Sequence, residues 1–432
     1  MLTVFLILTS LFAVLTWKDL HKGLFLLTAL LPSYLLRTYM GPVPTTLLEL
    51  LILTFVIIWF IKRNRLPFTP MFPRGIFITI LLLILAATIS IAVSSQIVAA
   101  VGIWKAYFIE PFLLFFIISF EIRHNDRHVL SQGLFKALGV SAMVIGSVAI
   151  IQWITGAGLP IPWDIERRVT SVFDYPNAVG LFLGPIFIIG FQELIAQRIT
   201  ISFLKKNLFW IFVCLLSFTA IILAQSEAAV VAVVATVVAR GLFDQSSRKK
   251  TILLGLLATL VILISPWLGL VIQKLTLQDY SGGVRLSQWT ETVELLKDHW
   301  VLGAGLSGYQ TALIPYHRAT HFEIFQYPHN ILLNIWVELG LLGVIAFFLL
   351  TYSIIKVPKD PISTIAFFAL LEMTIHGLVD VPYFKNDLAV MTWILIAITL
   401  KTSAKLDEIA LNGLLSPENP TQSRENGVNG RP

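Results

Sequence analysis

The sequence predicts an all-α, polytopic integral membrane protein with about 12–14 transmembrane helices and a large outside loop that contains short helices. Three observations support this fold class. The 432 residues are 56% hydrophobic and only 13% charged, whereas soluble domains carry about a quarter charged residues. Apolar stretches long enough to span a bilayer recur along the chain. Lys and Arg residues are concentrated in alternate connections between these stretches.

Thirteen apolar segments can be separated by their polar connections. The first two are short and form either two spans or a hairpin, which gives the range of span numbers. The apolar N-terminus lacks a basic region and a small-residue cleavage site, so we expect a first span and not a signal peptide. The segments are 2–16, 23–36, 46–61, 75–93, 106–120, 134–154, 178–195, 208–224, 226–240, 251–273, 331–355, 361–380 and 386–400.

The positive charge indicates the orientation of the chain. Of the 31 Lys and Arg residues, 22 fall in alternate connections that begin with 17–22. Cytoplasmic loops carry this excess, so the C-terminus should be cytoplasmic. The net charge of +6 is then explained by topology and contact with membrane lipids, and no nucleic-acid partner is expected. The single cysteine, Cys214, lies in an apolar segment and excludes a disulfide framework.

Two domains are expected from the composition. Residues 1–401 form the transmembrane domain, and the polar, Pro/Gly/Asn-rich residues 402–432 form a cytoplasmic tail that should be disordered. Two connections on the outside, 155–177 and 274–330, are longer than a connector needs, and such loops are often functional. Apolar residues recur at helical spacing over 284–300, which predicts a helix inside the second loop.

Three basic positions fall on the outside under a topology chosen without them. They are Arg168, with Arg167 beside it, Arg285 and His329. Guanidinium groups bind phosphate bidentately and remain charged, so two of them could hold a diphosphate at the membrane surface. The alternative is that these arginines only solvate loops or contact lipid headgroups.

His329 precedes the helix expected to begin near Ile331. The positive end of that helix favours a neutral imidazole, which can act as a general base. A capping or interfacial histidine is the alternative, and Asn330 is an equally good cap. Glu338 lies inside the apolar run, where it could make a polar contact with a neighbouring helix or tune the site; we expect the structural use. Gly340 just beyond it permits close helix approach.

Two further groups of ionisable residues suggest other functions. His317 and His321 are four residues apart with Glu323 nearby, a spacing that binds zinc on a helix; no further ligand is evident, so no metal site is predicted. Glu372, His376 and Asp380 fall at i, i+4 and i+8, so we expect them to line one face of a late span. This face would suit a transporter or flippase of an anionic lipid-linked glycan, a substrate cavity or a structural polar seam.

Three motifs together resemble the O-antigen ligase/polymerase superfamily over residues 75–400. The run "HNILLNIWVELGLLG" is similar to its His…Glu-x-Gly-x-x-Gly signature, and "RRVTSVFDYPN" and "VRLSQWTETVELLKDHWVLGAG" resemble its two arginine segments. The chain departs from the family pattern at Ser226-Glu227 and at His299-Trp300. The matching residues are Arg168, Phe173, Pro176, Asn177, Arg285, Trp289, Gly303, Gly305, His329, Asn330, Glu338, Gly340 and Gly343.

The resemblance implies a glycosyltransferase of the cytoplasmic (inner) membrane with its active site on the outer face. The donor would be a polyprenyl-diphosphate-linked glycan, and the acceptor a hydroxyl of a glycan, lipid or protein. Arg168 and Arg285 would bind the diphosphate and His329 would be the catalytic base, without cofactor or metal. The supporting residues would be Arg167, Asn177, Trp289, Arg318, Asn330, Glu338, His376 and Asp380. The sequence does not separate a ligase from a polymerase, and a membrane scaffold is a third class of function.

Overall fold

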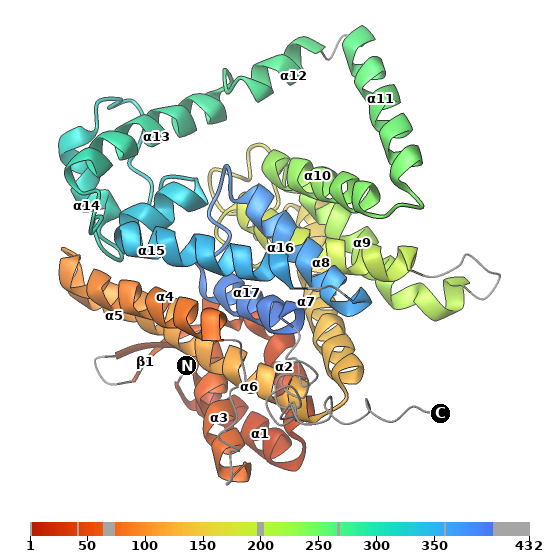
Figure 1. Ribbon diagram of the computed structural model, residues 1–432, viewed down its shortest axis with the longest axis vertical. Coiled ribbons are helices and arrows are strands. Elements are labelled where there is room, and N and C mark those ends of the chain that lie inside the picture. The colour runs from red at the N-terminus through yellow and green to blue at the C-terminus, as the bar shows by residue number, and fades with distance from the viewer. Residues whose placement is uncertain are drawn as a thin grey trace, which may run out of the picture.

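The computed structural model describes residues 2–40, 43–63, 74–196, 203–265, 268–357 and 360–400. These ranges are almost entirely helical, which confirms the all-α fold class (Figure 1). The elements are α1 (Leu2–Lys18), α2 (Leu20–Ala29), η1 (Leu31–Leu35), β1 (Arg37–Met40), β2 (Val43–Thr46), α3 (Leu47–Lys62), α4 (Arg74–Val93), α5 (Ile97–Trp104), η2 (Lys105–Ile109), α6 (Glu110–His124), α7 (Arg127–Thr155), α8 (Pro176–Ile195), α9 (Phe203–Leu223), α10 (Glu227–Phe243), α11 (Arg248–Ile264), α12 (Leu268–Leu275), α13 (Tyr280–Asp298), α14 (Tyr309–Leu313), η3 (Ile314–Tyr316), α15 (Ile331–Lys356), α16 (Pro361–His376) and α17 (Asn386–Thr399).

Six helical stretches are long and apolar enough to cross a membrane within the described ranges. Elements α5, η2 and α6 form one of them, Ile97–His124, and α4, α7, α8, α9 and α15 supply the others. Three further helices, α1, α16 and α17, are apolar but shorter. These lengths and compositions make the protein polytopic in the membrane.

The structure changes the boundaries of several predicted segments. Segment 23–36 becomes the ten-residue α2 followed by η1, because Pro32 stands at the start of a new turn. Segment 251–273 is divided between α11 and α12. The predicted outside connection 37–45 forms part of a two-stranded hairpin that the sequence analysis missed. The predicted disordered tail, 402–432, lies outside the described residues.

The long outside loop is partly helical, as predicted for residues 284–300. Helix α13 covers Tyr280–Asp298 and begins where Asp279 accepts a hydrogen bond from the Gly282 amide. Helices α11, α12 and α13 follow one another along one edge of the molecule, and α13 brings the chain to α14 and α15 (Figure 1). This arrangement places α13 over the start of α15.

Helix α15 is interrupted in its middle. Gly340 has a φ of 65°, which interrupts the helical backbone and is a conformation that only glycine adopts readily. The loop after α13 fills the break, because Val301 accepts a hydrogen bond from the Leu341 amide and Ala304 donates one to Val337, at 2.9 and 2.7 Å. The first part of α15 is thereby fixed against the outside loop.

Candidate active site

His329 lies immediately before α15 in a backbone conformation that is rare for its residue type. Its φ is +48°, and a left-handed conformation costs a residue with a Cβ roughly 1–2 kcal/mol. Hydrogen bonds on both sides hold this segment. Trp289 Nε1 donates to the Pro328 carbonyl at 2.8 Å, and Asn330 accepts from the Leu332 and Leu333 amides. Strain that is held in this way is typical of functional positions.

Asp380 is the ionisable partner of His329. Its Oδ1 lies 3.4 Å from His329 Nδ1, and the Asp380 side chain is 1% exposed against 18% for His329. Burial raises the pKa of Asp380, but the hydrogen bond from His329 and the attraction of His329 and His376 outweigh this effect and leave it below its ordinary value. An imidazole that donates from Nδ1 to this carboxylate keeps Nε2 as a proton acceptor.

The segment that follows α16 carries Asp380 to this position. Helix α16 ends at His376, so the prediction that Asp380 continues the face of Glu372 and His376 is wrong. Instead, Asn330 Nδ2 donates to the Leu378 carbonyl at 3.0 Å, and the Ile331 amide donates to Gly377 at 2.7 Å. The segment 377–380 is therefore hydrogen-bonded to the start of α15. These hydrogen bonds bring Asp380 next to His329.

Glu372 and His376 form a separate buried pair. The Glu372 carboxylate lies 3.5 Å from His376 Nδ1, and the side chains are 0% and 1% exposed. A Cβ on Gly184 of α8 would lie only 2.3 Å from Glu372 Oε1. Glycine at this position thus lets the Glu372 side chain of α16 pack closely against α8.

Arg285 lies beside the His329–Asp380 pair. It is half-buried on α13, and its Nε donates to the Val379 carbonyl at 2.9 Å, one residue before Asp380. Trp289 is one helical turn further on, and its hydrogen bond reaches the residue before His329. Helix α13 therefore contacts both halves of the pair through one face.

Arg168 approaches from the other outside loop. Its guanidinium lies over the Trp163 ring, 4.9 Å from the centroid, and Nε donates to the Ala224 carbonyl at 3.3 Å. Partial burial lowers its pKa, opposed by Glu166 and Glu227. Among the residues that the structure describes, no hydrogen bond joins Arg168 to His329 or Arg285. The neighbouring Arg167 is exposed and has a φ of +51°.

Two tyrosines join the loop of Arg168 to the loop of His329. The Tyr175 and Tyr327 hydroxyls are 3.0 Å apart, and the Tyr327 ring lies 5.2 Å from the imidazole of His329. Sequence analysis missed this contact, since neither tyrosine belongs to a periodic pattern. It brings the two predicted outside loops together at one place.

Lys385 is a further cation that sequence analysis missed. Its ammonium lies over the rings of Tyr34, Phe173 and Tyr175, at 5.7, 4.8 and 5.0 Å from their centroids. Burial lowers its pKa, opposed by nearby carboxylates that include Asp380. A signal was present in the sequence, because a lysine is uncommon in a connection that the charge distribution predicts to lie on the outer side.

Glu338 contacts the loop that fills the break in α15. Its Oε2 accepts a hydrogen bond from the Ser307 amide at 2.8 Å, and its backbone carbonyl accepts one from the Ser90 hydroxyl of α4. The side chain is 4% exposed. Glu338 thus connects α15, α4 and the outside loop; in the described ranges it makes no hydrogen bond with His329.

The other candidates lie at the edge of this arrangement. Asn177 is half-buried in the first turn of α8, and the Arg318 side chain is exposed. His317 is engaged by Glu291 at 3.0 Å, and Glu291 also accepts the backbone amides of Arg318 and Ala319. In the ranges that the structure describes, no group of three His, Cys, Asp or Glu residues could hold a metal ion.

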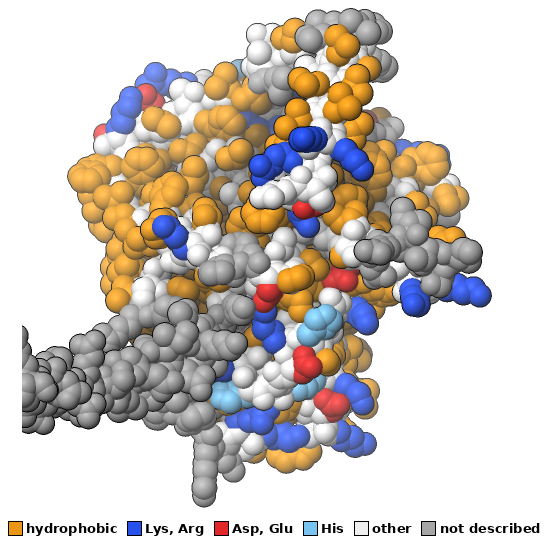
Figure 2. Space-filling view, turned by 45° about the vertical axis from the view of Figure 1, so that its right-hand side comes forward, with side chains coloured by type: hydrophobic (Ala, Val, Ile, Leu, Met, Phe, Trp, Pro, Cys, Tyr) orange, Lys and Arg blue, Asp and Glu red, His pale blue; other side chains and the backbone are white. Residues whose placement is uncertain are grey.

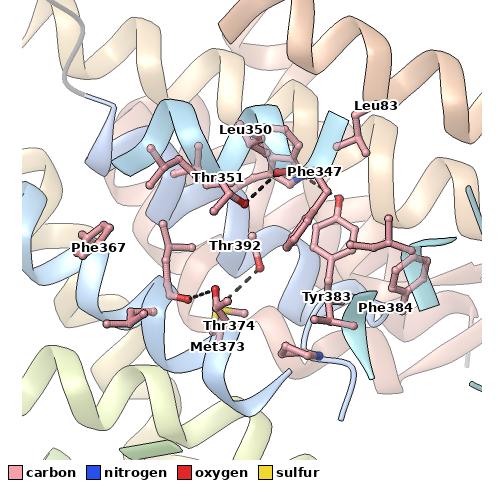
Figure 3. Close-up of a pocket in the computed structure, with 18 of the residues that line it drawn as sticks. Leu83, Phe347, Leu350, Thr351, Phe367, Met373, Thr374, Tyr383, Phe384 and Thr392 are labelled. Atoms are coloured by element: carbon pink, nitrogen blue, oxygen red, sulfur yellow. Dashed lines mark hydrogen bonds between the residues drawn. The ribbon is translucent and has the colours of Figure 1, made fainter. Parts of the chain in front are cut away.

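An apolar cleft of about 280 Å³ reaches the two chain segments that follow His329 and Asp380. It is lined by Ile331, two residues after His329, and by Pro382, two residues after Asp380, and it continues to Ile355 of α15. Figure 3 shows Phe347, Leu350 and Thr351 of α15 on one side and Met373, Thr374 and Thr392 of α16 and α17 on another. The cleft therefore extends along α15 within the apolar part of the molecule.

Comparison with known proteins supports the resemblance in the sequence. No curated protein matches the chain. A family model described as O-antigen ligase matches residues 212–348, which include Arg285, His329 and Glu338 but not Arg168 or Asp380. Residues 212–348 of this chain are thus similar to the O-antigen ligase family, in agreement with the motifs found in the sequence.

Proposed function

We propose that the protein transfers a glycan from a polyprenyl-diphosphate carrier to an acceptor hydroxyl on the outer face of the bacterial inner membrane. The observation that carries this proposal is the His329–Asp380 pair at the head of an apolar cleft, with Arg285 hydrogen-bonded to the same segment. A base, a cation and an apolar cleft are the three features that an amphipathic, diphosphate-activated donor requires.

His329 acts as the general base in this proposal. Asp380 holds the imidazole through Nδ1 and stabilises the positive charge that forms on it. Nε2 takes the proton of the acceptor hydroxyl while the acceptor oxygen attacks the anomeric carbon of the donor. The bond from that carbon to the diphosphate oxygen breaks, and its electron pair leaves with the diphosphate. The glycosidic bond and a polyprenyl diphosphate are the products.

Arg285 and Arg168 stabilise the leaving diphosphate, where negative charge develops. Arginine is suited to this role because it stays charged and presents parallel N–H groups to phosphate. These charges can replace a divalent ion, so we propose a metal-independent reaction. The hydrogen bond between Tyr175 and Tyr327 joins the loops that carry Arg168 and His329, so both can contact one donor.

The apolar cleft binds the polyprenyl chain next to the diphosphate. Its lining residues are almost all apolar, and Thr351, Thr374 and Thr392 direct their hydroxyls to Phe347, Leu370 and Leu388 carbonyls of their own helices. These hydroxyls are therefore satisfied and leave an apolar surface. Burial of each prenyl CH₂ contributes about 0.8 kcal/mol, so even a partly buried chain would anchor the donor.

The test is a transfer assay on purified protein in liposomes, with a polyprenyl-diphosphate oligosaccharide donor and a chelator present. We expect transfer by the wild type and its loss in His329→Ala and Arg285→Ala. The matched controls are His321→Ala, an exposed histidine of the same loop, and Lys297→Ala, an exposed cation of the same helix; both should retain activity. Full transfer by His329→Ala would contradict the base assignment. Movement of unchanged donor across the bilayer, without a new glycosidic bond, would instead indicate the transporter.

A further inference from the structure

A polar cleft of about 320 Å³ lies where α1 ends, α2 begins and α3 ends. Figure 2 shows basic, acidic and histidine side chains gathered near the lower end of the molecule, the level at which Figure 1 labels α1 and α3. No role in glycan transfer uses this cleft. Its lining residues are Lys18, Asp19, Leu20, His21, Lys62 and Arg63.

The cleft is at the opposite end of the bundle from His329. Asn125, whose side chain donates to Glu121 beneath the cleft at 2.8 Å, stands just before α7. Helix α7 has 29 residues and so extends about 43 Å before it enters the loop that carries Arg168. This distance is about the thickness of a bilayer with its headgroups. The cleft therefore belongs to the surface that the charge pattern assigns to the cytoplasm.

The acidic residues at the cleft are already paired. Glu121 is 1% exposed on its side chain and accepts hydrogen bonds from Trp59 Nε1 at 2.7 Å and from Arg63 at 3.1 and 2.9 Å, with His21 Nε2 at 3.1 Å. These contacts fix Arg63 and His21 in place. Asp19 accepts the Lys22 amide at the start of α2, and its carboxylate lies 3.5 Å from the Lys22 ammonium.

Two lysines at the cleft are the source of its positive charge. In the described part of the chain, neither Lys18 nor Lys62 has a carboxylate within ion-pair distance. Lys62 Nζ donates to the Trp17 carbonyl and lies 5.9 Å from the centroid of the Trp17 ring. The cleft thus carries excess positive charge on a floor that is held rigid by the Glu121 hydrogen bonds, as an anion-binding site requires.

Exposed apolar side chains of α1 and α3 lie next to the cleft, on the side that faces the membrane interior. Val14 and Trp17 of α1 are 56% and 52% exposed, and Phe60 and Ile61 of α3 are 43% and 50% exposed. Tryptophan is enriched at the boundary between headgroups and hydrocarbon. A ligand that fits both surfaces has an anionic head and apolar chains.

We propose that this cleft binds the phosphate headgroup of an anionic phospholipid, with Lys18 and Lys62 on the phosphate and the acyl chains along the exposed faces of α1 and α3. Basic pockets between helices on the cytoplasmic side of membrane proteins recognise such headgroups. The site is independent of the proposed transfer reaction, because it shares no residue with the His329–Asp380 pair or the apolar cleft.

The test measures lipid binding to the full-length protein in neutral detergent. Cardiolipin, phosphatidylglycerol, phosphatidylcholine and inorganic phosphate are titrated in turn, with the Tm and native mass spectra as readouts. The variant is the double substitution Lys18→Ala and Lys62→Ala, at two exposed positions. The matched control is Lys249→Ala and Lys250→Ala, which removes the same charge from exposed positions on the same predicted side that do not line this cleft.

We expect the two anionic lipids to raise the Tm of the wild type and of the control equally. The Lys18/Lys62 variant should keep its Tm without lipid but bind anionic lipid about 25-fold more weakly, since each lysine near a phosphate contributes about fivefold. Equal binding by both double variants would overturn the proposal in favour of diffuse charge attraction. An equal shift with phosphatidylcholine, or the full shift with inorganic phosphate alone, would overturn the assignment of an anionic lipid.

Discussion

Arg285 donates its Nε–H to the carbonyl oxygen of Val379 at 2.9 Å, so the helix that carries the arginine is hydrogen-bonded to the segment that carries Asp380. The same helix reaches the residue before His329 through Trp289. Cation, base and carboxylate are thereby positioned by one helix, although they are far apart in the sequence. Because the three groups share this support, a substitution at any one contact should have a defined effect on transfer activity or stability.

Asp380→Asn should lower the kcat for transfer by about 10²-fold or more and change the KM for the donor little. The amide keeps the shape of the side chain but not the charge that stabilises a protonated His329. The kinetics of purified protein, measured as a function of pH, check this result. Asp164→Asn, at an exposed carboxylate of the Arg168 loop, is the control. A changed KM with an unchanged kcat would contradict the positioning role.

Trp289→Phe should reduce transfer without unfolding the protein. Phenylalanine preserves most of the ring but leaves the Pro328 carbonyl without its donor at 2.8 Å, which costs about 1–3 kcal/mol for a buried group. The strained backbone of His329 then loses one of its restraints. Activity and Tm should be measured together, and an active variant with wild-type kinetics would show that the other hydrogen bonds suffice.

Gly340→Ala should destabilise the protein strongly. A Cβ at this position would lie 2.4 Å from the Val301 carbonyl oxygen, and the φ of 65° is unfavourable for alanine by roughly 1–2 kcal/mol. Gly255→Ala is the control, since a Cβ there meets nothing within 4 Å and the position is in the interior of helix α11. We expect a clearly lower Tm for the first variant and an unchanged or slightly higher Tm for the second. Equal Tm values would disprove the close packing at the break.

The segment 317–319 should become less ordered in acid. Burial raises the pKa of Glu291, but hydrogen bonds from the Ala319 amide, the His317 side chain and the Arg318 amide outweigh it and lower the pKa below 4.5. A depressed pKa adds stability that is complete above the unfolded value and is lost as the pH falls through the folded value. Hydrogen exchange of the Arg318 and Ala319 amides should therefore rise, relative to other loops, below about pH 4.5.

Glu291→Gln provides the comparison for this measurement. Glutamine can still accept the amides but has no charge to lose in this pH range. Its segment should exchange faster than that of the wild type at neutral pH and should show no added increase in acid. A wild-type segment whose protection is constant down to pH 3 would refute the prediction.

Much of the fold could be predicted from the sequence because helices that cross a bilayer must consist of long, mostly apolar segments. Each of the thirteen apolar segments contains a helix in the structure, and α13 follows the spacing of its apolar residues. The boundaries that were missed depend on local backbone chemistry, such as Pro32 after α2. The β1–β2 hairpin was missed because it is too short for a periodic pattern.

The candidate site could be predicted only in part. Arg285 and His329 stand in recognisable motifs, and their shared side followed from the distribution of charge. The role of Asp380 could not be read correctly, because the helix before it ends four residues earlier and a contact between residues 51 positions apart has no local signature. The Tyr175–Tyr327 contact depends on how two loops fold together, which periodicity does not encode.

The first part of α15 connects His329 rigidly to the apolar cleft proposed for the lipid tail. His329 precedes this helix, and Ile331, Ile335 and Leu339 line the apolar cleft along it. One residue inserted between Ile331 and Ile335 would turn the two by about 100° relative to each other. In the proposed function, the helix therefore fixes the rotational position of the donor's lipid tail relative to its reacting end. Variation in this short stretch should be limited to side-chain exchange, because a change in its length would place the tail and the base on different sides.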